Sequence, residues 1–254
     1  MAKVKTSAKS SSTRKKKDSE VQVDWQQVAR LALTSCSIDE IEENELVKAG
    51  EVTYQFSSKG HELAQVLLGL ALDHPHDGAA VYYRSRPFML ASGLTIQEAF
   101  AADMARSGSP SEGRDVGVVY SMPPRRGATI LPASGDVGAQ FTPAAGWAQA
   151  IQYYRSELGD KAWDDAISVA LGGDGSVATN GFWSALTMAT TLSLPMLFFI
   201  EDNGYGISVP SSFQTPGGNI TRNLASFQNL LVLEGSGTDP QEAGALISEA
   251  VASV

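Results

Sequence analysis

The sequence predicts an α/β protein: a three-layer parallel sheet with helices on both faces. Two runs, AISVAL at 166–171 and MLFFI at 196–200, are apolar without alternation, and a helical pattern over about 181–192 separates them. Strands that are apolar on both faces are typical of parallel sheets, because helices cover both sides of such a sheet. A third apolar run, LLVL at 230–233, is predicted to add a further strand.

The first half of the chain is predicted to supply three helices and one short strand. A helical pattern begins after Asp24, whose side chain can cap it. A second helix is expected over about 60–72, and a short strand over 79–83. Thr95 and Glu98 have the three-residue spacing of a capping box, which predicts the start of a third helix.

The second half alternates between helices and strands. A segment rich in Gly, Pro and Arg at 108–138 is expected to be a loop, and Thr142 with Pro143 then predicts the start of a helix. The apolar strands follow, and Asp239 with Pro240 opens a last helix. Short connections between these elements favour a parallel arrangement of the strands.

Composition and charge divide the chain into a tail and a body. Residues 1–22 hold seven basic and two acidic residues and almost no large apolar residue, so we expect a disordered tail. The net charge of −9 on the whole chain therefore leaves −14 on residues 23–254, the predicted domain, and so acidic a body repels nucleic acid. The single cysteine, Cys36, and the lack of a membrane-length apolar run favour a cytoplasmic protein without a membrane partner, with the mitochondrial matrix as the second choice.

Polar and glycine-rich motifs follow the two long apolar strands. GGDGS at 172–176 comes after the first strand, and EDNGYG at 201–206 comes after the second. Ligands of parallel sheets bind beyond the carboxyl ends of the strands. Asp174 and Asn203 offer a carboxylate and an amide oxygen at those ends, and such ligands, together with phosphate oxygens, suit Mg²⁺.

Two other interpretations of the first motif stay open at this point. Residues 173–178 read G-x-G-x-x-A between a strand and a helix, which is the fingerprint of a dinucleotide site, although a carboxylate at Asp174 would repel the pyrophosphate. The segment also suits a tight turn in which Asp174 caps the following helix. The turn by itself does not account for Asn203 at the second strand end.

The motifs GDG at 173–175 and DN at 202–203 resemble the thiamine diphosphate fingerprint. The segment 171–212 resembles throughout the alpha subunit, or the N-terminal alpha half of a fused alpha–beta chain, of thiamine diphosphate-dependent 2-oxo acid dehydrogenases of the branched-chain and pyruvate type. The similarity extends back to about Val28 through GHE at 60–62, YR at 83–84 and GR at 113–114.

This resemblance implies a site for thiamine diphosphate and Mg²⁺. Asp174, the side chain of Asn203 and the backbone carbonyl of Tyr205 would bind the metal, and Tyr83 and Arg84 would hold the diphosphate. A guanidinium group suits that role because it can donate two hydrogen bonds to phosphate oxygens. The implied cofactor-binding residues are Tyr83, Arg84, Gly135, Val137, Asp174, Gly175, Ser176, Asn203 and Tyr205.

The chain departs from the family pattern at three positions. Phe56 stands where relatives often have a histidine, and Val119 stands where some branched-chain members have one. Glu201 stands where some members have arginine and others glutamate. The three histidines of the chain offer no obvious replacement. The residues that transfer protons are therefore left unassigned.

The resemblance implies an enzyme that decarboxylates a 2-oxo acid and transfers the acyl group to a lipoyl-bearing acyltransferase. The segment NGYGISVPSS at 203–212 resembles the branched-chain members of the family, which favours a branched-chain substrate. In this family the glutamate that contacts the aminopyrimidine belongs to a beta subunit or beta half, and no segment of the sequence resembles it. We therefore expect a chain truncated at its C-terminus, which acts only in a two-fold alpha–beta assembly.

Other functions are compatible with parts of the pattern. A pyruvate or acetoin dehydrogenase, or a transketolase-like enzyme, would use the same cofactor. A dinucleotide-binding oxidoreductase would use 173–178 as its phosphate loop. A catalytically inactive interaction protein would keep the fold and lose the cofactor, and the presence of Asp174, Asn203 and Arg84 argues against it.

Overall fold

The computed structural model describes residues 23–115, 117 and 120–254. The predicted tail of residues 1–22 and the position of Val119 lie outside the described residues.

A four-stranded parallel sheet forms the centre of the structure. Its strands are β1 (Gly78–Ala80), β2 (Thr129–Ile130), β3 (Ser168–Gly173) and β4 (Met196–Glu201), in the order β2-β1-β3-β4. The α/β class, the parallel sheet and three of the predicted strands are confirmed. Strand β2 lies inside the segment that we expected to be a loop, because two residues are too few to show a strand pattern.

Helices connect and flank these strands. The α-helices are α1 (Trp25–Ile41), α2 (Glu62–Ala71), α3 (Arg86–Ala91), α4 (Ile96–Asp103), α5 (Phe141–Ser156), α6 (Asn180–Leu192), α7 (Ile220–Leu224) and α8 (Pro240–Ser253). A π-helical turn, η1 (Glu42–Leu46), continues α1, and 3₁₀ turns cover η2 (Lys161–Trp163), η3 (Asp174–Ala178), η4 (Ser211–Phe213) and η5 (Pro216–Gly218). A small antiparallel hairpin pairs β5 (Tyr205–Gly206) with β6 (Val209–Pro210).

The caps predicted from the sequence are present. Asp24 accepts hydrogen bonds from two backbone N–H groups of the first turn of α1, and Asp239 does the same at the start of α8. Thr95 and Glu98 form a reciprocal capping box at α4. These contacts satisfy N–H groups that have no partner within their own helix.

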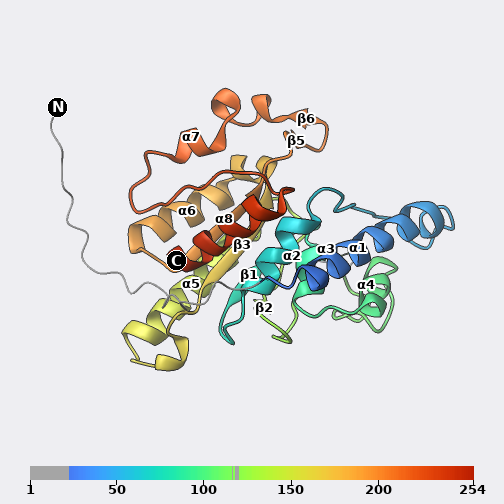
Figure 1. The fold of residues 1–254 in the computed structure, drawn as a ribbon, viewed down its shortest axis with the longest axis horizontal. Coiled ribbons are helices and arrows are strands. Elements are labelled where there is room, and N and C mark those ends of the chain that lie inside the picture. Colours follow the sequence, from blue (N-terminus) through green and yellow to red (C-terminus); the bar gives the residue numbers. More distant parts are fainter. Residues whose placement is uncertain (1–22, 116, 118–119) are drawn as a thin grey trace.

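Two hydrophobic clusters pack against the sheet. Val169 and Leu171 of β3 belong to one cluster, with side chains from α1, α2, α3 and α8. Ala170, between them, belongs to a second cluster with Phe141 of α5 and Phe182 of α6. Since successive side chains of a strand point to opposite faces, the two clusters lie on opposite faces of β3. Figure 1 shows α8 lying beside α2, and the two helices contact each other.

The predicted strand at 230–233 is wrong. This segment makes no ladder with any strand in the part of the chain that the structure describes, and β4 is the last strand of the sheet. Leu230 and Val232 are partly buried against the second cluster, while Leu231 between them is 57% exposed. The apolar side chains that suggested a strand thus pack without backbone pairing.

A buried ion cluster joins α1, η1, α3 and α4. Arg86 donates to Glu42 at 2.7 and 2.9 Å, to Asp103 at 3.0 Å and also to Asp39. All four side chains are buried. One positive charge therefore faces three carboxylates. Burial and the hydrogen bond with Asp103, opposed by Arg86, raise the pKa of Glu42 to about 9.

This shift predicts a pH dependence of stability. The folded-state pKa of Glu42 lies above its ordinary value of 4.5, so its contribution to stability is present below about pH 4.5 and is lost as the pH rises through about 9. Between those values the free energy of unfolding should fall with pH more steeply in the wild type than in Glu42→Gln, with about 1.4 kcal/mol per pH unit as the ceiling for one proton.

Urea unfolding of the wild type and of Glu42→Gln at several pH values measures the difference. The matched control is Glu43→Gln, whose carboxylate pairs on the surface with Lys59. Parallel wild-type and Glu42→Gln curves would contradict the assignment.

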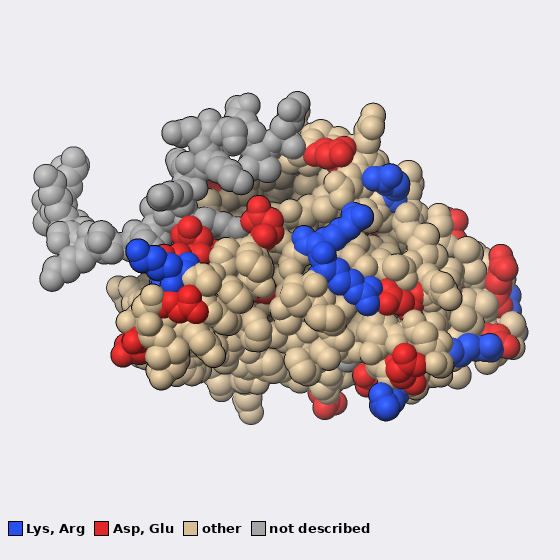
Figure 2. All heavy atoms as spheres, turned by 90° about the horizontal axis from the view of Figure 1, so that it is seen from below, with Lys and Arg blue, Asp and Glu red and all other residues tan. Residues whose placement is uncertain are grey.

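The surface shows mixed charge. On the face drawn in Figure 2, Lys and Arg side chains lie among Asp and Glu side chains. Among the helices of the described residues, none combines the length and the apolar character needed to span a bilayer.

Candidate functional site

A cavity of about 140 Å³ lies at the carboxyl ends of β1, β3 and β4. The sequence motifs predict a ligand site at this same edge of the sheet. The structure brings all nine predicted site residues to this cavity: Tyr83, Arg84, Gly135, Val137, Asp174, Gly175, Ser176, Asn203 and Tyr205 line it. They come from four segments of the chain that lie far apart in sequence.

Asp174 is the buried acid of the cavity. It directly follows β3, begins the 3₁₀ turn η3, and is 2% exposed. Its Oδ2 atom is buried and has no hydrogen-bond partner among the described residues. Burial, and then the nearby carboxylate of Asp202, raise the pKa of Asp174 above its usual value. An unpaired carboxylate oxygen in this position fits a bound cation, which would offset both effects.

The turn after β3 packs closely against the β5–β6 hairpin at Gly175. A Cβ atom on Gly175 would lie 2.8 Å from the Gln214 side-chain oxygen and 3.3 Å from the Cα of Gly206. A side chain at position 175 would therefore have to displace the Gln214 side chain and would crowd the backbone of the β5–β6 hairpin. The Ser176 hydroxyl donates to the carbonyl of Gly173 at 2.5 Å and is thus occupied within the turn.

The second strand end supplies further oxygen atoms. The Asn203 side-chain oxygen accepts from the backbone N–H of Tyr205 at 3.0 Å, and this bond fixes the amide beside β5. The same residues line the cavity. In the described part of the chain, no three His, Cys, Asp or Glu side chains gather as a metal site. The predicted donor set, with one carboxylate, one amide and one carbonyl oxygen, suits an Mg²⁺ ion that also binds phosphate.

Tyr83 and Arg84 form the opposite wall. They follow β1 and precede α3, a short helix that sequence reasoning missed. The Arg84 guanidinium donates to the carbonyl of Ser57 at 2.8 Å and lies 5.3 Å from the centre of the Tyr83 ring. Phe56, one of the expected departures from the family pattern, packs on Tyr83 with ring centres 4.6 Å apart.

The sequence did not identify every lining residue. Tyr82, Gln140 and Gln214 also line the cavity. Gln140 is buried and donates to the carbonyl of Leu171 at 2.9 Å, so it supports β3. Burial, and then the carboxylate of Glu201, raise the pKa of Tyr82 well above its usual value, so its hydroxyl remains a donor. The residue types of Tyr82, Gln140 and Gln214 alone did not indicate that these side chains line the cavity.

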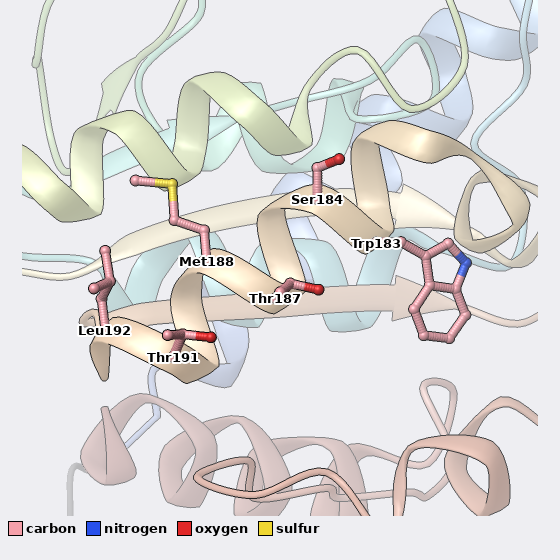
Figure 3. A pocket seen from close by; sticks show the side chains of 6 residues that line it. All are labelled: Trp183, Ser184, Thr187, Met188, Thr191 and Leu192. Carbon is pink, nitrogen blue, oxygen red and sulfur yellow. The ribbon is translucent and has the colours of Figure 1, made fainter.

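A second hollow lies on α6, away from these groups. Figure 3 shows its six lining side chains along one side of the helix: Trp183, Ser184, Thr187, Met188, Thr191 and Leu192. Its volume is about 610 Å³, larger than that of the cavity at the strand ends. None of these six side chains titrates near neutral pH, so they offer no group for acid–base chemistry.

Comparison with known proteins assigns the chain to a family. The model of the family described as dehydrogenase E1 component matches residues 31–251. The 2-oxoisovalerate dehydrogenase subunit alpha of Bacillus subtilis is 29% identical over 206 residues, which are 81% of this chain and 59% of that protein. The mitochondrial 2-oxoisovalerate dehydrogenase subunit alpha of Caenorhabditis elegans is 27% identical over 173 residues, 68% of this chain and 38% of that protein. The pyruvate dehydrogenase E1 component subunit alpha of Staphylococcus aureus is 28% identical over 170 residues, 67% of this chain and 40% of that protein.

These matches confirm the resemblance to alpha subunits that the strand-end motifs indicated. The matched region covers between 38% and 59% of the length of these three relatives. The match to the family model, residues 31–251, contains all nine predicted site residues, which lie between residues 83 and 205. The chain belongs to the dehydrogenase E1 component family.

Proposed function

We propose that this chain is the alpha part of a 2-oxo acid dehydrogenase and that it binds thiamine diphosphate with Mg²⁺ at the strand-end cavity. The four-stranded sheet and its two hydrophobic clusters would belong to the three-layer thiamine diphosphate-binding fold. The observation that carries this proposal is Asp174, a buried carboxylate with an unpaired oxygen, in a cavity lined by all nine predicted residues.

Each part of the cavity has a defined task in this proposal. Asp174, the amide of Asn203 and the carbonyl of Tyr205 would hold Mg²⁺, whose charge would offset that of the diphosphate. Arg84 would donate to phosphate oxygens, and the Tyr83 ring beneath its guanidinium would keep it in place. Gly175 would let the backbone approach the diphosphate, because no side chain stands in the way.

The reaction needs a partner. Thiamine diphosphate supplies the group that accepts the electrons released when a 2-oxo acid loses carbon dioxide. A beta subunit or beta half would supply the carboxylate for the aminopyrimidine, and a lipoyl-bearing acyltransferase would receive the acyl group. We propose a two-fold assembly of two alpha and two beta units in the cytoplasm.

The dinucleotide interpretation has less support. In such a site the helix that receives the pyrophosphate starts close to the strand and presents free N–H groups. Here the 3₁₀ turn η3 separates β3 from α6, and its first residue is the buried Asp174. A carboxylate at that position repels a phosphate unless a cation lies between them.

Decarboxylation should require both parts of the enzyme. Residues 1–254 alone should release no carbon dioxide from a 2-oxo acid in the presence of thiamine diphosphate and Mg²⁺, since the aminopyrimidine carboxylate is expected on the beta partner. The same assay on the full enzyme, with its beta part, should show turnover. Turnover by residues 1–254 alone would refute the split site, and a full enzyme without turnover on any 2-oxo acid would refute the proposed function.

The substrate is proposed to be a branched-chain 2-oxo acid, on the resemblance of residues 203–212. The full enzyme should have a specificity constant for 2-oxoisovalerate about tenfold or more above that for pyruvate, because the added methyl groups fill an apolar pocket. Steady-state assays with both acids measure the ratio. A preference for pyruvate would reverse the assignment within the same enzyme class.

A further inference from the structure

Glu201 stands at the centre of a buried network behind the cavity. It is the last residue of β4 and pairs in register with Gly173, the residue before Asp174. One carboxylate oxygen accepts from the Tyr82 hydroxyl at 2.6 Å and from the Gln65 amide at 2.9 Å. The other lies 3.1 Å from Nδ1 of His61. The side chain of Glu201 is 7% exposed, so these contacts are largely shielded from water.

Gln65 extends the network to the wall that carries Arg84. Its amide nitrogen donates to the backbone carbonyl of Arg84 at 3.2 Å as well as to Glu201. Its amide oxygen accepts from the backbone N–H of Phe88 at 3.4 Å, in the first turn of α3. Gln65 is fully buried. One glutamine therefore connects the end of β4 with the backbone of Arg84 and with the first turn of α3.

The network joins the two walls of the cavity. The metal-binding wall stands on the ends of β3 and β4, and the diphosphate-binding wall is residues 82–84. The Tyr82 hydroxyl fixes the start of that segment to Glu201, and Gln65 fixes its end. A carboxylate accepts hydrogen bonds from neutral donors with about twice the usual strength, which makes Glu201 an effective anchor.

We propose that Glu201 is a positioning residue, which holds residues 82–84 so that Arg84 faces the metal-bound diphosphate. This inference rests on the proposed function. A group that fixes the orientation of a ligand-binding side chain without touching the ligand commonly changes affinity by roughly 10- to 100-fold when it is removed. Removing the Glu201 carboxylate should therefore lower the affinity for the cofactor, and this loss can be measured in the absence of substrate.

Two substitutions at Glu201 separate positioning from charge. In Glu201→Gln, the amide oxygen can accept from Tyr82 and Gln65. The amide nitrogen can donate to Nδ1 of His61 in the tautomer that carries its proton on Nε2, so all three contacts can survive. In Glu201→Ala all three are lost. We expect thiamine diphosphate, measured by calorimetry with saturating Mg²⁺ on the full enzyme, to bind Glu201→Gln within about threefold of wild type and Glu201→Ala roughly 10- to 100-fold more weakly. Inorganic pyrophosphate with Mg²⁺ should give the same ranking.

A second single variant, Tyr82→Phe, keeps the test decisive if Glu201→Ala folds poorly. Tyr82→Phe removes only the hydroxyl that donates to Glu201, and it should weaken thiamine diphosphate binding by roughly tenfold, the value of one hydrogen bond to a charged group. Added to Glu201→Ala, it should weaken binding no further. Tyr153→Phe, on an exposed part of α5, is the matched control and should bind as wild type does.

The outcomes separate this inference from the function on which it rests. A wild-type enzyme that binds neither thiamine diphosphate nor pyrophosphate would overturn the proposed function. If the wild type binds and Tyr82→Phe binds equally well, or if Glu201→Gln is as impaired as Glu201→Ala, the positioning role of Glu201 alone is overturned.

Discussion

Replacing Asp174 with alanine is expected to abolish detectable binding of thiamine diphosphate. Asp174 contributes the one buried carboxylate of the predicted metal site, and its Oδ2 atom has no other partner in the described structure. Without it, Mg²⁺ would lose its only negatively charged protein ligand, and the diphosphate would lie in the cavity with its charge uncompensated. Calorimetric titration of the full enzyme with thiamine diphosphate and Mg²⁺ measures the loss.

Asp202→Ala is the matched control. Its carboxylate lies near enough to raise the pKa of Asp174, but its oxygen accepts from the backbone N–H of Gly204 at 3.1 Å and is not a predicted metal ligand. Its removal should leave binding detectable. Asn203→Ala, in contrast, should behave as Asp174→Ala does. Wild-type affinity in both Asp174→Ala and Asn203→Ala would refute the metal site.

Replacing Arg86 with methionine should strongly destabilise the fold. Methionine has a similar length, but it leaves the carboxylates of Asp39 and Asp103, and the carboxyl group of Glu42, buried without a cation. Removing one partner of a buried ion pair costs about 3–5 kcal/mol, because the charges that remain are uncompensated. Urea unfolding of wild type and variant should show this difference in the free energy of unfolding.

The surface pair of Arg125 and Glu98 provides the comparison. Arg125 donates to both oxygens of Glu98 at 2.7 and 2.8 Å, but its side chain is 35% exposed. Arg125→Met should cost no more than about 1 kcal/mol, since water solvates the charge that is left. An Arg86→Met variant that loses no more than Arg125→Met would contradict the account of the buried cluster.

Local signals made much of the fold predictable. Asp24, Asp239 and the pair Thr95 and Glu98 cap their helices as expected, because a cap depends on residues within one turn. The two long apolar strands were also predictable, since burial on both faces leaves continuous hydrophobic runs. The segment at 230–233 has the same composition and no partner strand, and only the tertiary structure could distinguish the two cases.

The candidate site was predictable only in part, for a related reason. The residues at the strand ends could be placed together because the carboxyl ends of parallel strands meet at one edge. The contact of Gln65 with Glu201 spans 136 residues, and that of Arg86 with Asp39 spans 47. Hydrophobic periodicity in the sequence predicts helices and strands, but it does not predict contacts between residues that are so far apart in the chain. The supporting network and the buried ion cluster therefore emerged only from the structure.

The strand order has a consequence for synthesis on the ribosome. Strand β1 lies between β2 and β3, and Asp77 just before it accepts from the backbone N–H of Ile167, 90 residues further along the chain. At roughly 5–20 residues per second, β1 waits about 5–18 s after its own synthesis before β3 exists. Through that interval β1 has no partner on the β3 side, so the parallel sheet cannot be completed until residue 173 has left the exit tunnel.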